Sequence, residues 1–256
     1  MSRIALLSDI HANRHALEAV LQEVEHLGVD KAVCLGDTVG YGAYPGECVR
    51  LLRSHGICGV LGNHDFYALQ LAKEPLDEEV AGGLLAHPVW GPLVLACEQL
   101  DDDDWQWLVE QSDTLTEAGA VLSHATLHER PEWRYLDDDH EVAATLAELS
   151  THDSRTGFFG HTHVFSIFHL PQDSGKVTEC GPCQWHLPED APCATTVASV
   201  GQPRSANSRA SFAIWDESTR ILEHHEVDYD AKKAAAAIVR AGLCHHNARR
   251  LLFRGR

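Results

Sequence analysis

Short apolar runs alternate with helical patterns over the first 61 residues of the chain. The runs long enough for buried strands are residues 4–8, 31–35 and 57–61. Between them, residues 15–27 place leucine and valine at helical spacing, with Asn13 suited to cap that helix and Gly28 to end it. Residues 45–54 predict a second helix with proline in its first turn. This β-α-β-α-β order predicts a largely parallel sheet covered by helices.

The pattern changes along the rest of the chain. Residues 64–111 indicate helices with interruptions at Gly82-Gly83, Pro88 and Pro92, followed by a strand at 120–123, a helix at 139–150 and a strand at 157–159. Beyond residue 163, turn sequences such as PQDSG and DEST separate short runs, which favours antiparallel pairing. These runs are residues 164–170, 176–180, 195–200, 211–215 and 221–227.

A helical tail follows from about residue 230 to 256, with Gly242 dividing it into two segments. The chain shows neither an internal repeat nor a low-complexity linker. We therefore expect one domain with two sheets over residues 1–256.

The acidic run at residues 101–104 stands directly before the sequence WQWLVE. Acidic side chains at the start of a helix are stabilised by the helix dipole, so the run indicates a helix start. An acidic metal-binding cluster is the alternative.

Composition excludes some classes of protein. With 44% hydrophobic and 23% charged residues, the 256-residue chain is typical of a soluble globular protein. Its formal net charge of −18 argues against a basic nucleic-acid-binding face, because such a surface repels phosphate at long range. Bound metal cations could still attract a small anionic substrate. No run reaches the roughly 18 apolar residues that span a bilayer, and no signal-peptide pattern is present, so we expect a cytoplasmic protein with no membrane partner and reduced cysteines.

Polar side chains gather at the carboxyl ends of five predicted strands. Because ligands of open α/β sheets bind beyond these ends, the clusters predict one shared site. Its metal-ligand candidates are Asp9, His11, Asp37, Asn63, His124, His161 and His163. Each cluster alone has an ordinary structural interpretation, a hydrogen-bonded histidine or a helix-capping aspartate. The coincidence of five is what favours a site.

The residue types indicate which ions would bind. Carboxylates, imidazoles and an amide without thiolates suit manganese, iron or zinc. One ion takes about four to six ligands, and two ions sharing a bridging carboxylate would use all seven candidates.

The ordered set of motifs resembles the calcineurin-like metallophosphoesterases. The resemblance covers residues 3–201 through the sequences DIHAN, GD, GNHD, SH and GHTH, and the sequences SVGQPR and RASFAIWD resemble a bacterial subgroup. It implies a four-layer α/β/β/α sandwich of two mixed sheets with two divalent metal ions at one end.

The same resemblance implies a role for each residue. Asp9, His11 and His163 would bind the first metal, Asn63, His124 and His161 the second, Asp37 would bridge them, and His64 would face the substrate as general acid. The implied activity is hydrolysis of a phosphate ester or phosphoanhydride by a metal-bridging hydroxide. A small phosphodiester, phosphomonoester or dinucleoside polyphosphate is the expected substrate.

The sequence departs from the protein Ser/Thr phosphatases of this family. Those enzymes carry Asp-Arg-Gly after the second motif and arginine before the Gly-Asn-His motif, where this chain has Gly40-Tyr41-Gly42 and Leu61. A protein phosphatase therefore becomes an alternative, alongside a non-catalytic metal- or nucleotide-binding member. The aspartate that orients the catalytic histidine is also missing, so either Asp65 or the backbone would have to orient His64.

Three further residues have two interpretations each. Asn13 could contact substrate or cap the following helix. Arg204 could meet substrate phosphate or be a solvated or salt-bridged loop residue, and Tyr41 could line the pocket or pack.

Cys180, Cys183, His186 and Cys193 form a second cluster, with the spacing of a zinc loop or a thioredoxin-like pair. An ordinary loop with free thiols is the alternative. The histidine pairs 224–225 and 245–246 are expected at the surface.

Overall fold

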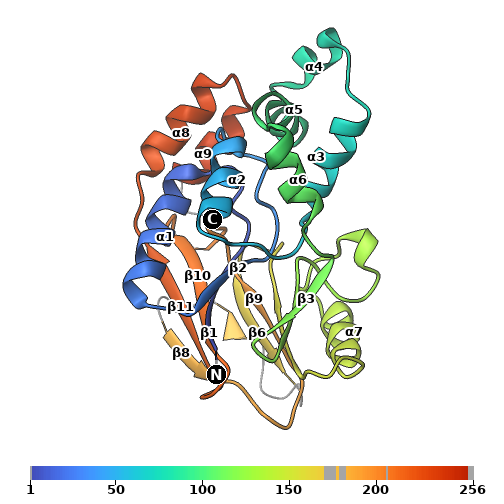
Figure 1. Cartoon of the computed structure of the whole chain (residues 1–256), viewed down its shortest axis with the longest axis vertical. Coiled ribbons are helices and arrows are strands. Elements are labelled where there is room, and N and C mark those ends of the chain that lie inside the picture. The colour runs from blue at the N-terminus through green and yellow to red at the C-terminus, as the bar shows by residue number, and fades with distance from the viewer. Residues whose placement is uncertain (1, 170–176, 179–182, 206, 253–256) are drawn as a thin grey trace.

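Two mixed β-sheets form the centre of the computed structural model, which describes residues 2–169, 177–178, 183–205 and 207–252. Figure 1 shows the sheets in the lower half of the molecule, with helices on both sides and a larger group of helices above. The first sheet has the strand order β2-β1-β10-β11-β8 and the second β3-β4-β5-β9-β6-β7.

The first sheet joins the two ends of the chain. Its strands are β1 (Arg3–Leu7), β2 (Lys31–Cys34), β8 (Cys183–His186), β10 (Ala210–Asp216) and β11 (Ile221–Val227). β1 runs parallel to β2 and antiparallel to β10. The strand β11 then pairs antiparallel with both β10 and β8. The predicted parallel start and antiparallel continuation are therefore both confirmed.

The second sheet comes from the middle of the chain. Its strands are β3 (Thr114–Glu117), β4 (Ala120–Ser123), β5 (Thr156–Phe159), β6 (Phe165–His169), β7 (Val177–Thr178) and β9 (Cys193–Val197). β4, β5 and β9 are parallel neighbours, while β3, β6 and β7 pair antiparallel. β3 and β8 were not predicted, because each is a four-residue edge strand with many polar side chains.

Alternate residues of each strand point into two different apolar layers. Ile4 and Leu6 of β1 meet Leu122 and Phe158 between the sheets. On the outer face of the first sheet, Leu7 and its neighbours pack against α1 (Arg14–Leu27) and α2 (Pro45–Ser54). The outer face of the second sheet packs against α7 (Asp139–Leu149). The predicted four-layer α/β/β/α sandwich is confirmed.

The third predicted strand is wrong as a regular element. Residues 57–61 make only isolated bridges, from Gly59 to Cys34 and from Val60 to Ser112. At Gly59 a Cβ would lie 1.7 Å from the Cys34 carbonyl oxygen, so only glycine permits this close approach. The helix α3 (Asn63–Lys73) begins three positions after Val60, which ends the pairing.

The broken helical region forms a separate apolar cluster above the sheets. Its elements after α3 are α4 (Glu78–Leu84), α5 (Trp90–Gln99) and α6 (Asp102–Val109). The acidic run starts α6, as predicted, because Asp101 accepts a hydrogen bond from Asp104 N at 2.9 Å. Asp104 is fully buried and pairs with Arg50 and Arg53 of α2, which ties α6 to the first sheet's helical layer.

The predicted tail forms α8 (Ala231–Arg240) and α9 (His245–Leu252), divided at Gly242 with a φ of 72°. Buried Asn247 of α9 donates hydrogen bonds to the carbonyl oxygens of Tyr41 and Pro88. The tail therefore fixes a loop that follows β2. Among the described helices, none has the length and apolar character needed to cross a membrane.

Candidate metal centre

Five ligand-type residues occupy the left-handed region of backbone conformation, which residues other than glycine rarely adopt. They are Asp9 (φ 52°), His11 (49°), Asp37 (55°), His161 (66°) and His163 (60°). All follow the carboxyl ends of β1, β2 and β5. Such strain costs of order 1–3 kcal/mol per residue and persists where surrounding structure enforces it, typically at functional sites.

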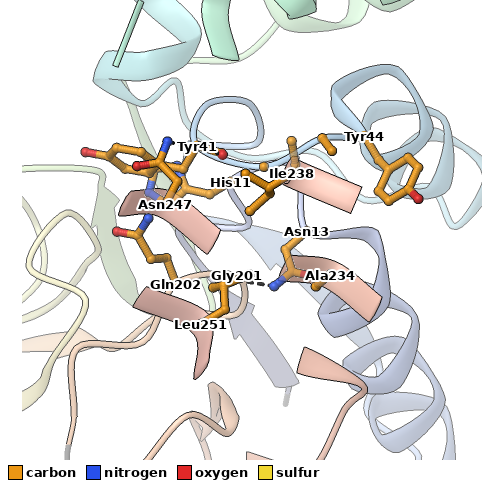
Figure 2. A pocket seen from close by; sticks show the side chains of 13 residues that line it. His11, Asn13, Tyr41, Tyr44, Gly201, Gln202, Ala234, Ile238, Asn247 and Leu251 are labelled. Atoms are coloured by element: carbon orange, nitrogen blue, oxygen red, sulfur yellow. Dashed lines mark hydrogen bonds between the residues drawn. The ribbon is translucent and has the colours of Figure 1, made fainter. Parts of the chain in front are cut away.

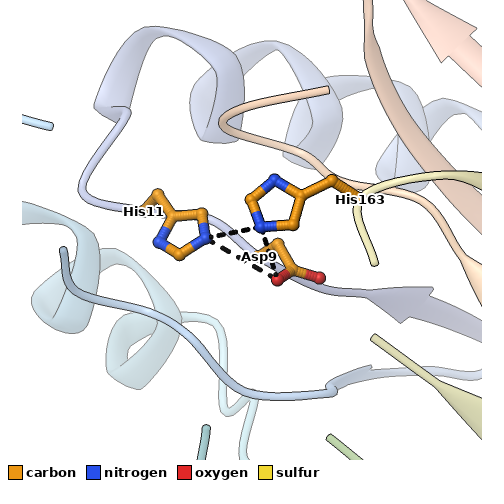
Figure 3. A group of neighbouring side chains, drawn as sticks. All are labelled: Asp9, His11 and His163. Carbon is orange, nitrogen blue, oxygen red and sulfur yellow. Dashed lines mark hydrogen bonds and ion pairs between the residues drawn. The ribbon is translucent and has the colours of Figure 1, made fainter. Parts of the chain in front are cut away.

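Asp9, His11 and His163 form the first group of side chains (Figure 3). His163 Nε2 lies 3.2 Å from Asp9 Oδ1 and 3.1 Å from His11 Nε2. His11 Nε2 lies 3.6 Å from the same carboxylate oxygen. The three side chains are almost completely buried, so three ligand atoms converge on one point away from solvent.

Asp37, His124 and His161 form the second group, with their ligand atoms within 4.8 Å of one another. Asn63 joins it, because its Oδ1 lies 3.1 Å from His124 Nε2. The structure therefore brings all seven predicted metal ligands to one end of the two sheets.

Asp37 lies between the two groups. Its Oδ2 is 3.7 Å from His11 Nε2 of the first group and 3.3 Å from His124 Nε2 of the second. Its Oδ1 accepts a hydrogen bond from His64 N at 2.8 Å, at the start of α3. One oxygen is thus fixed to the protein while the other faces both groups, which is the arrangement that a bridging carboxylate needs.

Backbone carbonyls orient three of the imidazoles. A ring whose Nδ1–H donates to a carbonyl presents the lone pair of its Nε2, the atom that binds a metal. The pairs are His11 Nδ1 with Val39 O (3.1 Å), His124 Nδ1 with Leu35 O (2.7 Å) and His163 Nδ1 with Gln202 O (2.6 Å). In all three the Nε2 atoms point into the site.

Several buried polar atoms at the site have no hydrogen-bond partner in the described part of the chain. Asp9 Oδ1 and His161 Nε2 are two of them. Buried polar groups are normally paired, and these two atoms are ligand atoms of the two groups. Together with the oxygen and nitrogen donor set, they fit divalent transition-metal ions.

Charge coupling within the chain keeps both aspartates ionised. Burial alone would raise their pKa values, but the nearby imidazoles outweigh burial and hold the pKa of both Asp9 and Asp37 well below the usual range. For Asp9 the strongest lowering comes from His163, and for Asp37 from His124. Burial likewise lowers the pKa of His124, but Asp37 outweighs it and raises that pKa to about 9.

His64 lies next to these groups without a polar partner for its Nδ1 among the described residues. Its ring packs against Tyr41, with centroids 4.6 Å apart, and against the backbone of Gly40. Asp65 does not orient it: the Asp65 carboxylate accepts backbone hydrogen bonds from Thr38, Val39 and Gly62. Ring packing and backbone contact therefore orient His64.

Burial lowers the pKa of His64 to about 4. The imidazole is consequently neutral at pH 7 in the chain alone, rather than in the protonated form that the expected general-acid role needs. A bound phosphate dianion beside the ring favours the protonated form and raises that pKa.

Of the two predicted substrate contacts, only Arg204 remains available. Asn13 Oδ1 accepts from Ala16 N at 3.2 Å and Asn13 Nδ2 donates to Gly201 O at 2.8 Å, so this residue caps α1 and ties two loops (Figure 2). Arg204 donates its backbone N–H to His163 O, and its side chain lines a cavity beside the site.

Tyr41 combines the two expected roles. Its ring packs against both His11 and His64, and it lines a small cavity of about 10 Å³ between the metal-site loops and α8–α9 (Figure 2). Burial raises the pKa of its hydroxyl.

The cysteine cluster does not converge in the described residues. Cys183 and His186 are three positions apart on β8, with alternating exposure, so their side chains point to opposite faces of the sheet. Cys193 is buried in β9 of the other sheet, and Cys180 lies outside the described residues. A strand at Cys183 also replaces the helix start that thioredoxin chemistry needs.

The two histidine pairs differ in their exposure to solvent. His245 and His246 are exposed, as predicted. The prediction for His224 is wrong, because β11 turns this residue inward, where it stacks on Phe165 with ring centroids 4.4 Å apart. His225 is half-buried on the opposite face of the strand.

The site and the sandwich define a metallophosphoesterase-type protein, and comparison with known families agrees. The family model described as calcineurin-like phosphoesterase matches residues 2–165, more than half of the chain. The chain therefore belongs to the calcineurin-like phosphoesterase family.

Relatives extend the similarity to the whole chain. An uncharacterised protein of Methanocaldococcus jannaschii is 35% identical over 100% of this chain and 99% of its own length. The crystal structure of a metallophosphoesterase from Sphaerobacter thermophilus is 28% identical, covers 98% of each chain and superposes with a TM-score of 0.84. A hypothetical protein from Pyrococcus horikoshii OT3 shares the fold at 18% identity, with a TM-score of 0.77 over 100% of this chain and 99% of its own.

Proposed function

We propose that the protein is a two-metal phosphoesterase that hydrolyses a small phosphate ester or phosphoanhydride. One observation carries the proposal: Asp37 Oδ2 faces His11 on one side and His124 on the other, at 3.7 and 3.3 Å. Two complete ligand groups therefore share one carboxylate oxygen, which is the requirement for a pair of ions and not for one.

The first ion would be held by Asp9, His11 and His163, the second by Asn63, His124 and His161, and both by Asp37. Two divalent ions of manganese, iron or zinc supply charge that binds a phosphoryl group and lower the pKa of a bound water toward neutrality. The chain contributes only two carboxylates to this centre, so four positive charges leave it about +2 and attractive to phosphate. This local charge lets a chain of net charge −18 bind an anion.

His64 is the proposed proton donor to the leaving oxygen. It starts α3, directly after the ligand Asn63, and its backbone N–H fixes Asp37. This hydrogen bond fixes the backbone of His64 relative to the bridging carboxylate. The negative charge of bound substrate supplies the rise in pKa that the imidazole needs for proton donation.

Two features favour a small substrate over a phosphoprotein. Leu61 and Gly40 occupy the positions where the family's protein phosphatases have arginine and aspartate. The C-terminal helices also close over the Tyr41 loop, because Asn247 of α9 donates to the Tyr41 carbonyl. A protein Ser/Thr phosphatase and a non-catalytic binding protein are the alternatives.

The test is hydrolysis of a panel by Mn²⁺-loaded protein, with a phosphomonoester, a phosphodiester and a dinucleoside polyphosphate. We expect turnover of at least one of these compounds. His64→Ala should lose about 10²–10⁴-fold in kcat and keep its metal, because this side chain is a proton donor and not a ligand. His245→Ala, at an exposed histidine of α9, is the matched control and should keep full activity. Metal-loaded protein without any turnover would favour the non-catalytic alternative.

A further inference from the structure

A cavity of about 330 Å³ adjoins the metal centre on the side of the GHTH loop. Thr162 lines it, and the two residues that flank Thr162 in the chain are the proposed ligands His161 and His163. Tyr135 and Arg204 line it as well. Any group attached to a phosphoryl at the metal centre could therefore extend into this space.

Tyr135 presents an aromatic surface there. Its ring stacks on His161, with centroids 4.1 Å apart and planes 19° apart. The residue is 43% exposed, so part of its side chain is open to the cavity that it lines. A planar group entering the cavity can stack on an exposed ring of this kind.

Arg204 presents a cation there. In the described part of the chain its buried Nε has no hydrogen-bond partner and its guanidinium forms no ion pair. Other arginines of this acidic chain do pair: Arg50 and Arg53 with Asp104, and Arg209 with Glu226 and Asp228. Asp137 also lines the cavity, and among the described residues no ion pair joins it to Arg204. An unpaired arginine beside a phosphate site suits a second anionic group, since guanidinium binds phosphate with fixed geometry.

We infer that this cavity is the leaving-group subsite, and that the substrate is a phosphoanhydride or phosphoester whose leaving group carries its own phosphate on Arg204 and a planar ring on Tyr135. The inference rests on the proposed function. In the hydrolysis, the oxygen of water bonds to phosphorus and a water proton passes to solvent. The bond from phosphorus to the leaving oxygen breaks with its electron pair on that oxygen, which departs as an anion or takes a proton from His64. Arg204 stabilises the negative charge of the departing group, while Tyr135 selects its ring.

Binding to the metal-free chain tests the subsite without turnover. The probes are ADP, which has a ring and two phosphates, pyrophosphate, which lacks the ring, and phenyl phosphate, which lacks the second phosphate. Calorimetry should show that ADP binds most tightly to the wild-type chain. Arg204→Gln should weaken ADP and pyrophosphate at least about tenfold and phenyl phosphate less, because a charge-assisted contact to the second phosphate is lost.

The variants at Tyr135 separate stacking from packing. Tyr135→Leu should weaken ADP about fivefold or more and leave pyrophosphate unchanged, whereas Tyr135→Phe should restore ADP binding because the ring is kept. Arg209→Gln, at an arginine paired with Glu226 and Asp228, is the control for lost charge and should change none of the three.

The opposite results overturn the inference. They are equal affinity of the wild-type chain for ADP and phenyl phosphate, or unchanged ADP binding in both Arg204→Gln and Tyr135→Leu. Hydrolysis of the phosphoester panel by Mn²⁺-loaded wild-type protein is measured separately. Turnover together with unaltered binding in the variants would overturn the subsite and not the proposed function. Variant-dependent binding without turnover would overturn the proposed function and not the binding subsite.

Discussion

The Nε2 atoms of His11 and His163 lie 3.1 Å apart, although 152 positions separate the two residues in the chain. Each ring uses its Nδ1 on a carbonyl oxygen, Val39 for His11 and Gln202 for His163. The two Nε2 lone pairs therefore face each other, with Asp9 Oδ1 beside them. Three acceptors at such short range repel one another unless a cation joins them, which explains why this part of the fold suits a metal ion.

Gly40 is required for the position of His64. A Cβ at Gly40 would lie 2.4 Å from His64 Nδ1, and the residue has a φ of 92°. We expect Gly40→Ala to displace the imidazole and lower kcat at least about tenfold with little change in KM, because positioning losses act on the chemical step. Steady-state kinetics with the best compound of the panel gives this result.

Gly28→Ala is the control for backbone strain alone. Gly28 also has a positive φ, of 62°, but a Cβ there would meet no atom within 4 Å. This variant should lose about 1 kcal/mol of stability and no activity. Equal losses of kcat in the two variants would show that strain, and not contact with His64, sets the effect.

Asp104 should stabilise the junction between α2 and α6. The buried carboxylate accepts from Arg50 Nη1 at 2.5 Å and from Arg53 Nη1 at 2.7 Å. Asp104→Ala leaves both arginines without their shared partner, and we expect the free energy of unfolding to fall by about 2–4 kcal/mol. Asp103→Asn, at a side chain that is 82% exposed, should change it by less than about 1 kcal/mol. Urea denaturation measures both, and a similar loss in the two variants would contradict the assignment.

Regular periodicity explains what the sequence could predict. β1, α1 and α2 have apolar positions at the correct spacing, and Asn13, Gly28 and Pro45 define helix ends through local chemistry. The seven candidate metal ligands could be predicted because each closely follows an apolar run that predicts a strand, although the run before Asn63 forms only isolated bridges. The edge strands β3 and β8 escaped prediction because an edge strand buries too little to need an apolar pattern.

The surroundings of Tyr135, Arg204 and His224 depend on tertiary contacts, which the sequence does not show. Tyr135 lies in an irregular loop after β4, and no sequence pattern indicates that its ring stacks on His161. Arg204 has no ion pair among the described residues, and no sequence pattern shows this because it depends on where carboxylates distant in sequence lie. Both faces of β11 carry polar residues around His224, so the sequence could not show which face of the strand packs on Phe165.

Acidification should destabilise the metal-free protein. Burial lowers the pKa of His64 and of His161 to about 4, and burial also lowers that of His163. Between about pH 6.5 and 4 the unfolded chain therefore binds protons that the folded chain does not, so stability falls as pH falls through this window. His124, with its pKa raised to about 9, is largely protonated in both states below pH 6.5 and adds little there. Burial raises the pKa of Asp65 to about 6, so the folded chain gains one proton in the same window, which offsets one of the three histidines and leaves the net fall in stability.

Urea denaturation of metal-free protein from pH 7 to 5 measures this dependence. Each buried histidine contributes up to about 1.4 kcal/mol per pH unit where only the unfolded state is protonated. His161→Ala should show a shallower slope than wild type, and the exposed-site variant His246→Ala should not. A flat profile over this range would contradict the neutral, buried state of these imidazoles.

The central claim is that two ligand groups share Asp37, and metal stoichiometry tests it most directly. Metal-free protein is titrated with Mn²⁺, and bound metal per chain is counted after removal of free ions. Two ions per wild-type chain are expected, with weakened binding of a different ion in His163→Ala and in His161→Ala and unchanged binding in His245→Ala. One ion or none in the wild-type chain, or unchanged metal content in both ligand variants, would contradict the account.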